Sequence, residues 1–317
     1  MRKTANNVHV EGYFYDTDIA LKTVQNKNSE NFGTEFYNGS ISIATDEACT
    51  NIVKVSFTYV TALTKQGKPS PTFDNLTKIL EGGHSVTAEG KENATLVAIN
   101  TAFAENNFWS ARTNETISSV RLEGGFVNIL SSLNADENQR ATFETDTLVN
   151  AVTRVTPEEE DKEDFVKIRA AVFNFRNDII PIDLISFTGA DYFEDLASDD
   201  QPHFLKVFGI LDFQNITIKT EEEGAFGGPI VKTRTSRKKD FVVTNANPAE
   251  YEVAEDGEAD ITVIEIKKAL QDREVRLAEV KKNYDEYQAT KGSTPAFGGA
   301  TAKPANAAGA KVGDFKF

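Results

Sequence analysis

Apolar and polar residues alternate along most of the first 130 residues. In the run Asn7–Phe14 every second residue is apolar or glycine, which is the period-2 pattern of a half-buried strand. Further strand-like runs cover residues 36–44, 53–59, 96–99, 107–111 and 119–129. Between them, Thr72–Leu80 carries apolar residues at helical spacing. Strands with one intervening helix favour a small closed barrel over an α/β sheet, because no regular βαβ alternation is present.

The strand pattern restarts after an acidic connector at 156–164, which contains six acidic residues and one lysine. The new runs cover residues 166–173, 179–187, 203–213, 216–219, 230–233 and 240–244. We therefore predict a mostly β protein with tandem small barrels, the first in residues 1–155 and the second in residues 165–258. In the first barrel, Glu123-Gly124-Gly125 interrupts a strand pattern and predicts a β-bulge.

The spacing becomes helical from Ala259 onward. The apolar positions of this stretch, which follow a heptad seam, are Val263, Ile266, Leu270, Leu277, Val280, Tyr284 and Tyr287. The pattern predicts one long helix over residues 259–290 that either packs on the barrels or pairs with a second copy of the chain. Packing is favoured because Arg273 takes one seam position. Self-association through the helix is the alternative.

The segment 291–317 is rich in glycine, alanine and proline and has no apolar periodicity. Such a segment buries too little surface to offset its ordering entropy, so we predict a flexible tail. Asp314, Phe315 and Phe317 form its tip, and we expect this tip to bind a partner protein. The alternative is that the two aromatic rings fold back onto the barrels.

The residues that usually carry catalysis are scattered. His9, His84 and His203 are far apart, and none lies at a metal-ligand spacing from Cys49. The glycine-rich pieces lack the lysine and the serine or threonine of a phosphate-binding loop. We therefore expect no enzymatic activity, no catalytic residue, no metal site and no cofactor.

The cysteine content and the apolar runs bear on location. The single cysteine, Cys49, excludes an internal disulfide and favours a reducing compartment. No signal-peptide-like run opens the sequence, and no stretch approaches the roughly 18 apolar residues of a membrane span. The expected location is the cytoplasm, without membrane attachment.

The net charge of −15 is concentrated in two connectors. Residues 156–164 contribute −5 and residues 246–260 contribute −6, so most of the surplus lies outside the predicted strands. The predicted barrels are therefore nearly neutral, and a nearly neutral barrel can carry a basic groove on one face.

Aromatic and cationic residues on the predicted strands suit an unpaired nucleic-acid strand, which needs rings for its bases and cations for its phosphates. In the first barrel the candidates are Tyr13, Tyr15, Lys54, Phe108, Trp109, Arg112 and Arg121. In the second barrel they are Arg169, Phe173, Phe175, Arg176, Lys232, Arg234, Arg237, Lys238 and Lys239. The competing interpretation is core packing for each ring and a solvated hairpin for the basic cluster 232–239.

Three segments and the tail resemble those of bacterial and phage single-stranded DNA-binding proteins. Asn7–Phe14 is similar to the first strand of that family, and Gly39–Thr45 is similar to its second strand. Phe108–Thr116 resembles its aromatic-led hairpin, and the tethered tip ending in Phe317 resembles its terminal aromatic. The resemblance implies OB-fold barrels that coat unwound DNA in replication or recombination, a tail that recruits partner enzymes, and no cofactor. The extra barrel and helix suggest a phage-encoded form in a bacterial host.

We therefore predict a non-enzymatic protein that binds single-stranded DNA without reading its sequence. The choice between DNA and RNA stays open at this point. The alternative is a phage structural or assembly protein built from two β-modules, with the long helix used for oligomerisation.

Overall fold

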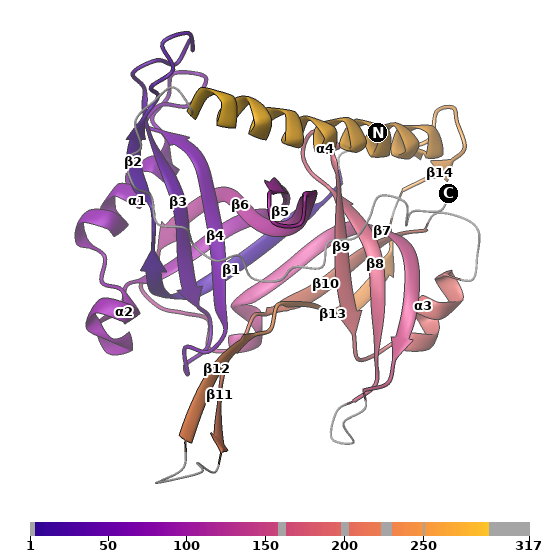
Figure 1. Cartoon of the computed structure of the whole chain (residues 1–317). Coiled ribbons are helices and arrows are strands. Elements are labelled where there is room, and N and C mark those ends of the chain that lie inside the picture. The colour runs from indigo at the N-terminus through magenta and orange to yellow at the C-terminus, as the bar shows by residue number, and fades with distance from the viewer. Residues whose placement is uncertain (1–3, 158–162, 198–202, 223–229, 250, 292–317) are drawn as a thin grey trace.

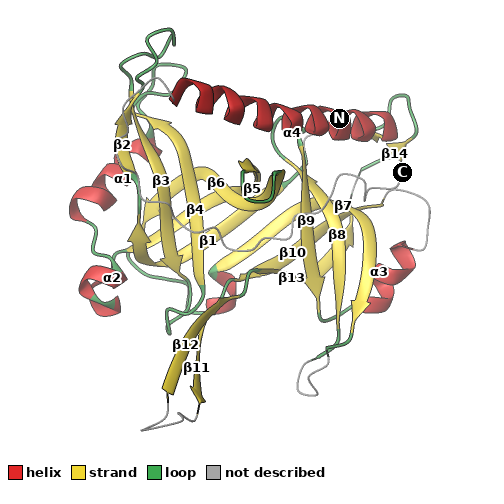
Figure 2. Cartoon of the chain, viewed as in Figure 1, coloured by secondary structure: helices red, strands yellow, loops and turns green. Residues whose placement is uncertain are grey.

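The computed structural model describes residues 4–157, 163–197, 203–222, 230–249 and 251–291, and it gives no side-chain detail for residues 215–237. Within these residues the chain is mostly β, with one long helix at the C-terminal end (Figure 2). This confirms the predicted fold class. The predicted tail lies outside the described residues, except for Lys291.

The first part of the chain contains six strands and two short helices. They are β1 (Asn6–Thr17), β2 (Ala20–Thr23), β3 (Glu35–Ala44), β4 (Ile52–Thr61), α1 (Pro71–Gly82), α2 (Val86–Glu89), β5 (Leu96–Ser110) and β6 (Glu115–Ile129). Single 3-10 turns lie at Lys91–Asn93 and Glu137–Gln139.

The second part begins with a long strand and ends with the long helix. Its elements are β7 (Ala141–Val155), β8 (Phe165–Phe173), β9 (Ile179–Ser186), α3 (Ala190–Ala197), β10 (His203–Asp212), β11 (Asn215–Glu222), β12 (Ile230–Arg237), β13 (Asp240–Pro248), β14 (Val253–Ala254), β15 (Ile261–Thr262) and α4 (Val263–Lys291).

Five strands of the first part close into a barrel. β1 pairs with β3, β3 with β4, β4 in parallel with β6, β6 with β5, and β5 again with β1. Numbered within the barrel, the neighbours run 1-2-3-5-4-1, and α1 lies between the third and fourth strands. This is the five-stranded Greek-key arrangement of an OB-fold.

The second part repeats the same circuit. β7 pairs with β8, β8 with β9, β9 in parallel with β13, β13 with β10, and β10 with β7. Helix α3 occupies the place of α1, and the β11–β12 hairpin is inserted between the fourth and fifth strands. The chain therefore contains two OB-fold barrels in tandem, and Figure 1 shows them side by side.

The two barrels share one eleven-stranded sheet. β1 pairs antiparallel with β7 from Asn6 opposite Thr145 to Val10 opposite Ala141. β7 lies within the segment predicted as the first barrel, but it supplies the first strand of the second circuit. The predicted division of the chain at residue 155 stays a prediction.

Glycines shape the first barrel at two points. A β-carbon added at Gly12 would lie 2.1 Å from the carbonyl oxygen of Ala44, so the missing side chain lets β1 approach β3 closely. Gly124 and Gly125 have positive φ angles of 70° and 106° at a register shift between β5 and β6. The predicted bulge at Glu123-Gly124-Gly125 is therefore confirmed.

Helix α4 runs across the same end of both barrels, opposite the β11–β12 hairpin (Figure 1). Ile266 and Ala269 are buried, and Arg273 is only 1% exposed. The Arg273 guanidinium lies 2.6 Å from Glu105 of β5 and donates to Ser118 of β6. The helix therefore packs on the barrels, as the charged seam position predicted.

Replacing Arg273 with alanine leaves the Glu105 carboxylate buried without its cation. Loss of one partner of a buried ion pair costs about 3–5 kcal/mol, and we expect that decrease in the free energy of unfolding in urea. Arg276→Ala is the matched control, because the Arg276–Asp178 pair is about one-third exposed on each side. Exposed pairs contribute about 0–1 kcal/mol, so equal losses for the two variants would contradict this role of Arg273.

Candidate nucleic-acid interface

An aromatic pair lies on the β3–β4 hairpin of the first barrel. Phe36 stands near the start of β3, Tyr59 stands near the end of β4, and their ring centroids are 4.6 Å apart. Tyr59 is 46% exposed. The outer face of the second and third strands is where OB-folds bind oligonucleotides.

A bulge turns Tyr59 outward. Val53, Val55 and Phe57 are buried on alternate positions of β4, and simple alternation would bury Tyr59 as well. The β3–β4 register shifts between Tyr37 and Gly39, so the extra residue reverses the faces beyond this point. The strand thereby exposes a ring that its sequence pattern assigns to the core.

The second barrel carries an aromatic pair at the corresponding place. Phe165 is the first residue of β8, Phe187 directly follows β9, and their ring centroids are 5.9 Å apart. Phe187 is 43% exposed. Both rings line a hollow of about 390 Å³ together with Lys238 and Asp240, which lie at the base of the β11–β12 hairpin. Each barrel thus presents two tilted rings from the start of its second strand and the end of its third.

Cations near these rings have local partners. Lys22 lies opposite Phe36 in the β2–β3 register, and its ammonium group donates to the Asn38 amide oxygen at 2.6 Å. In the second barrel, Lys238 lies 2.6 Å from Asp212 and 3.3 Å from Asp240. The two aspartates offset the charge of Lys238, whereas the Asn38 amide leaves the charge of Lys22 in place.

Two of the three predicted cations of the first barrel are paired with acids. Lys54 lies 3.1 Å from Asp18, and Arg121 lies 2.6 Å from Glu123. Arg112 is exposed at the β5–β6 turn and has no charged partner among the described residues.

The predicted rings Tyr13 and Tyr15 are half-buried on β1. The Tyr13 hydroxyl donates to both carboxylate oxygens of Glu47, at 2.9 and 2.8 Å. The ammonium group of Lys91 lies 5.6 Å from the centre of the Tyr13 ring. Tyr13 therefore belongs to a cluster with Glu47 and Lys91, on a different strand from the Phe36–Tyr59 pair.

Helix α4 covers part of the predicted β5–β6 hairpin. The ammonium group of Lys281 lies 4.9 Å from the centre of the Trp109 ring, and Trp109 is half-buried. Phe108 points to the other side of the strand and is 37% exposed. The structure thus separates the two neighbouring rings, with Trp109 against the helix and Phe108 at the surface.

Four predicted residues of the second barrel lie on or just after β8. Arg169 is half-buried, and Phe173 is fully buried and packs on Phe204 at 5.8 Å. The predicted stacking role is therefore wrong for Phe173, because its ring is sealed in the core. Phe175 is 76% exposed on the β8–β9 turn, with the guanidinium of Arg176 5.1 Å from its ring centre.

The basic cluster is only partly described. Lys232, Arg234 and Arg237 lie on β12, and their side chains are outside the described part of the chain. Lys239 donates to the Val120 carbonyl of the first barrel at 2.5 Å, and burial lowers the pKa of its ammonium group. Its ammonium group also lies 5.5 Å from the Phe213 ring centre, so Lys239 links the barrels. The predicted tail residues Asp314, Phe315 and Phe317 lie outside the described residues.

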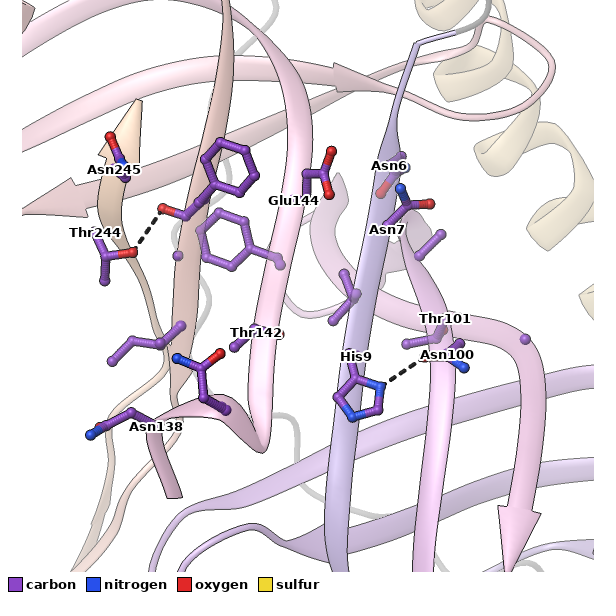
Figure 3. A pocket seen from close by; sticks show the side chains of 18 of the residues that line it. Asn6, Asn7, His9, Asn100, Thr101, Asn138, Thr142, Glu144, Thr244 and Asn245 are labelled. Atoms are coloured by element: carbon purple, nitrogen blue, oxygen red, sulfur yellow. Dashed lines mark hydrogen bonds between the residues drawn. The ribbon is translucent and has the colours of Figure 1, made fainter. Parts of the chain in front are cut away.

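A cavity of about 1150 Å³ lies along the seam between the barrels (Figure 3). Its lining is rich in carboxamides and includes Asn7, Asn100 and Asn245, and the His9 ring is hydrogen-bonded to Asn100 at 2.8 Å. No lysine or arginine is among its described lining residues. Because the lining carries Glu123 and Glu144 without a lysine or arginine to offset them, this cavity suits a nucleic-acid backbone less well than the two hairpin faces do.

The described residues contain no group of three or more His, Cys, Asp or Glu side chains placed to hold a metal ion. No helix among them is long and apolar enough to span a membrane.

Sequence reasoning missed the two aromatic pairs. Phe165 precedes the predicted strand 166–173 and Phe187 ends the predicted strand 179–187. At the end of a strand, too few alternating neighbours remain to show which face a ring takes. For Tyr59 the available signal was Asn38-Gly39 in the facing strand, since glycine within a strand often marks a bulge.

The barrels and their exposed hairpin faces define a tandem OB-fold protein. The sequence matches the family model described as YorF over residues 4–283, so the chain belongs to the YorF family. No curated protein matches the sequence.

Two solved structures of the single-stranded DNA-binding protein from Thermus aquaticus are similar to this chain. The wild-type protein has 11% sequence identity and a TM-score of 0.44, and the match covers 78% of this chain and 94% of that chain. A deletion mutant of the same protein gives 11% identity and a TM-score of 0.43, with coverage of 78% and 96%.

The Glu47 cluster makes stability depend on pH. Hydrogen bonds from Tyr13, Arg140 and Lys91 lower the pKa of Glu47 from 4.5 to about 2. A carboxylate with a depressed pKa stabilises the folded state above its unfolded pKa, and this contribution is lost as the pH falls from about 4.5 towards 2. Glu47→Gln should therefore lower the urea midpoint at pH 7, and its difference from wild type should shrink below pH 4.5. A constant difference down to pH 2 would contradict the assignment.

Proposed function

We propose that the protein is a non-enzymatic, sequence-independent single-stranded DNA-binding protein. The observation that carries this proposal is the pair of tilted rings on the second and third strands of each barrel, Phe36 with Tyr59 and Phe165 with Phe187. Exposed rings in a soluble protein favour a stacking ligand, and every base offers a flat face whatever its identity.

The arrangement supports an unpaired strand rather than a duplex. Paired bases are stacked inside a duplex, whereas the bases of a single strand are free to lie on the rings. Phe175 with Arg176, and the exposed Phe108 and Arg112, offer further rings and cations outside the two main pairs.

The charge pattern predicts how the strand is held. Lys54 and Lys238 are already paired with aspartates. A lysine that binds a DNA phosphate must therefore give up its carboxylate partner. This exchange contributes less than the neutralisation of a phosphate by an unpaired cation. We therefore propose that stacking supplies most of the affinity, with a modest salt dependence.

In the wider role that we propose, the protein coats unwound DNA during replication or recombination in the cytoplasm of a bacterium or of a phage-infected bacterium. The tail, through Asp314, Phe315 and Phe317, recruits a replication or recombination protein. This part rests on the sequence of the tail and on its resemblance to the tails of single-stranded DNA-binding proteins.

Truncating the exposed rings tests the stacking proposal. Each base–ring contact is worth about 1–3 kcal/mol, so Tyr59→Ala and Phe187→Ala should each weaken binding of a fluorescent oligo-dT by about 5- to 150-fold. Tyr192→Ala is the matched control, because this ring on α3 is 40% exposed but lies outside both hairpin faces. Unchanged affinity in both variants, or no oligo-dT binding by the wild type at low salt, would refute the proposal.

A salt titration of oligo-dT binding, with and without the residues after Lys291, distinguishes binding by the barrels from binding by the tail. The logarithm of the binding constant should fall linearly with the logarithm of salt concentration, by about 0.7 per phosphate contacted. We expect the full chain and the shortened chain to bind oligo-dT with similar affinities, because the rings and cations of the barrels remain. Loss of binding on truncation would move the DNA site to the tail.

A further inference from the structure

The Glu47 carboxylate lies inside a ring of cationic and hydroxyl donors. Tyr13 donates to both of its oxygens, Lys91 donates to Oε2 at 3.1 Å, and Arg140 donates to Oε1 at 3.0 Å. These donors come from three separate parts of the chain: β1, the turn before β5, and the residue before β7. The first barrel therefore gathers two cations and a phenol around one anion.

The Arg140 guanidinium is fixed independently of Glu47. Its side chain is only 6% exposed, and its Nε donates to the Asn134 carbonyl oxygen at 2.7 Å. Its Nη1 also faces the Thr45 carbonyl oxygen at 3.4 Å. A buried guanidinium held in this way needs an anion beside it, because an uncompensated buried charge is strongly destabilising.

Glu47 can leave this position without moving the backbone. Its side chain is 48% exposed, so the outer side of the carboxylate is open to solvent. The loop that carries it is held by its neighbour Asp46, whose carboxylate accepts from the backbone N–H groups of Thr50 and Asn51. A change of side-chain rotamer therefore suffices to withdraw the carboxylate.

The space beside the cluster admits a larger anion. A hollow of about 340 Å³ is lined by Tyr13, Glu47 and Lys91, together with the apolar side chains of Leu96 and Leu133. A lysine, an arginine and a hydroxyl that converge on one point form a donor set that suits phosphate oxygens as well as a carboxylate. The apolar wall leaves room for the group that bears the phosphate.

We propose that this cluster is a phosphate site, and that Glu47 occupies it when no phosphate is bound. Glu92 also lines the hollow, and Glu137 accepts from the Glu47 backbone N–H, so the surroundings are not positive overall. Glu47 must therefore withdraw before a phosphate binds, because a third carboxylate would repel it. The phosphate belongs either to a DNA strand, which rests on the proposed function, or to a free phosphate-bearing molecule.

Inorganic phosphate tests the site without DNA. Phosphate stabilises folded proteins more than chloride does even without a specific site, so the test compares the phosphate-minus-chloride difference in unfolding temperature between variants. At equal ionic strength this difference should be larger for the full-length Glu47→Ala variant than for wild type, because the anion binds only the folded state. Glu81→Gln should match wild type, since it removes the same charge from the exposed end of α1, outside the hollow. The double variant Glu47→Ala/Lys91→Met should lose the excess. An equal difference in Glu47→Ala and wild type would overturn the proposal.

Oligo-dT binding identifies the source of the phosphate. If the strand reaches the site, Glu47→Gln should bind oligo-dT more tightly and steepen the salt dependence by about 0.7, the value for one added contact on a single strand. Glu81→Gln should not change the slope. A phosphate effect with an unchanged slope assigns the site to a free phosphate group, and failure in both arms rejects it. Absence of oligo-dT binding by every variant would refute the proposed function but leave the phosphate arm decisive.

Discussion

The fold depends on strand β1, which joins three neighbours. One stretch, Asn6–Val10, pairs with β7 of the second barrel, and a later stretch, Tyr13–Thr17, pairs with β3 and closes the first barrel. The other edge of the strand pairs with β5 over Val8–Tyr13. Gly12 stands where β1 passes from one partner to the next, at a point where the Ala44 backbone leaves no room for a β-carbon. Closure of one barrel and attachment of the other therefore rely on the same twelve residues.

The shared sheet couples the two barrels energetically. One buried cluster contains residues of both barrels, among them Phe103 of β5 and Phe241 of β13, whose rings meet edge to face at 5.1 Å. Helix α4 adds a second connection, because Arg273 pairs with the first barrel and Arg276 pairs with the Asp178 turn of the second. Separation of the barrels would expose these rings and ions, so we expect them to unfold together.

The strands and helices could be predicted from the sequence, but which side of each strand is buried could not. Alternation around Val8 and Val10 predicted strands, the positive-φ pair Gly124–Gly125 was foreseen as a bulge, and Arg273 indicated a packed helix. Phe173 was misassigned because the end of β8 is covered on both faces, by the barrel core and by a cluster that includes Ile266 of α4. Alternation reveals two faces of a strand but not whether a distant helix covers the second.

The candidate site shows the same limit. Ion pairs such as Lys238 with Asp212 join residues that are far apart in the sequence, so a run of cations overstated the free positive charge. The exposure of Tyr59 follows from a register shift between β3 and β4, which depends on how the two strands pair. The sequence indicated that the site would use aromatic and cationic residues. Which cations are paired with acids, and which rings are exposed, depends on the three-dimensional structure.

The antiparallel contact between β1 and β7 has a geometric consequence for any directional ligand. These strands are the first strands of their barrels, so their antiparallel pairing relates the two barrels by an approximate two-fold rotation. A DNA strand has a 5′ end and a 3′ end, and one that crosses both barrels in the same sense must reverse its course between them. In the proposed DNA complex, a strand that engages both halves therefore follows a looped path rather than a straight one and needs a minimum contour length.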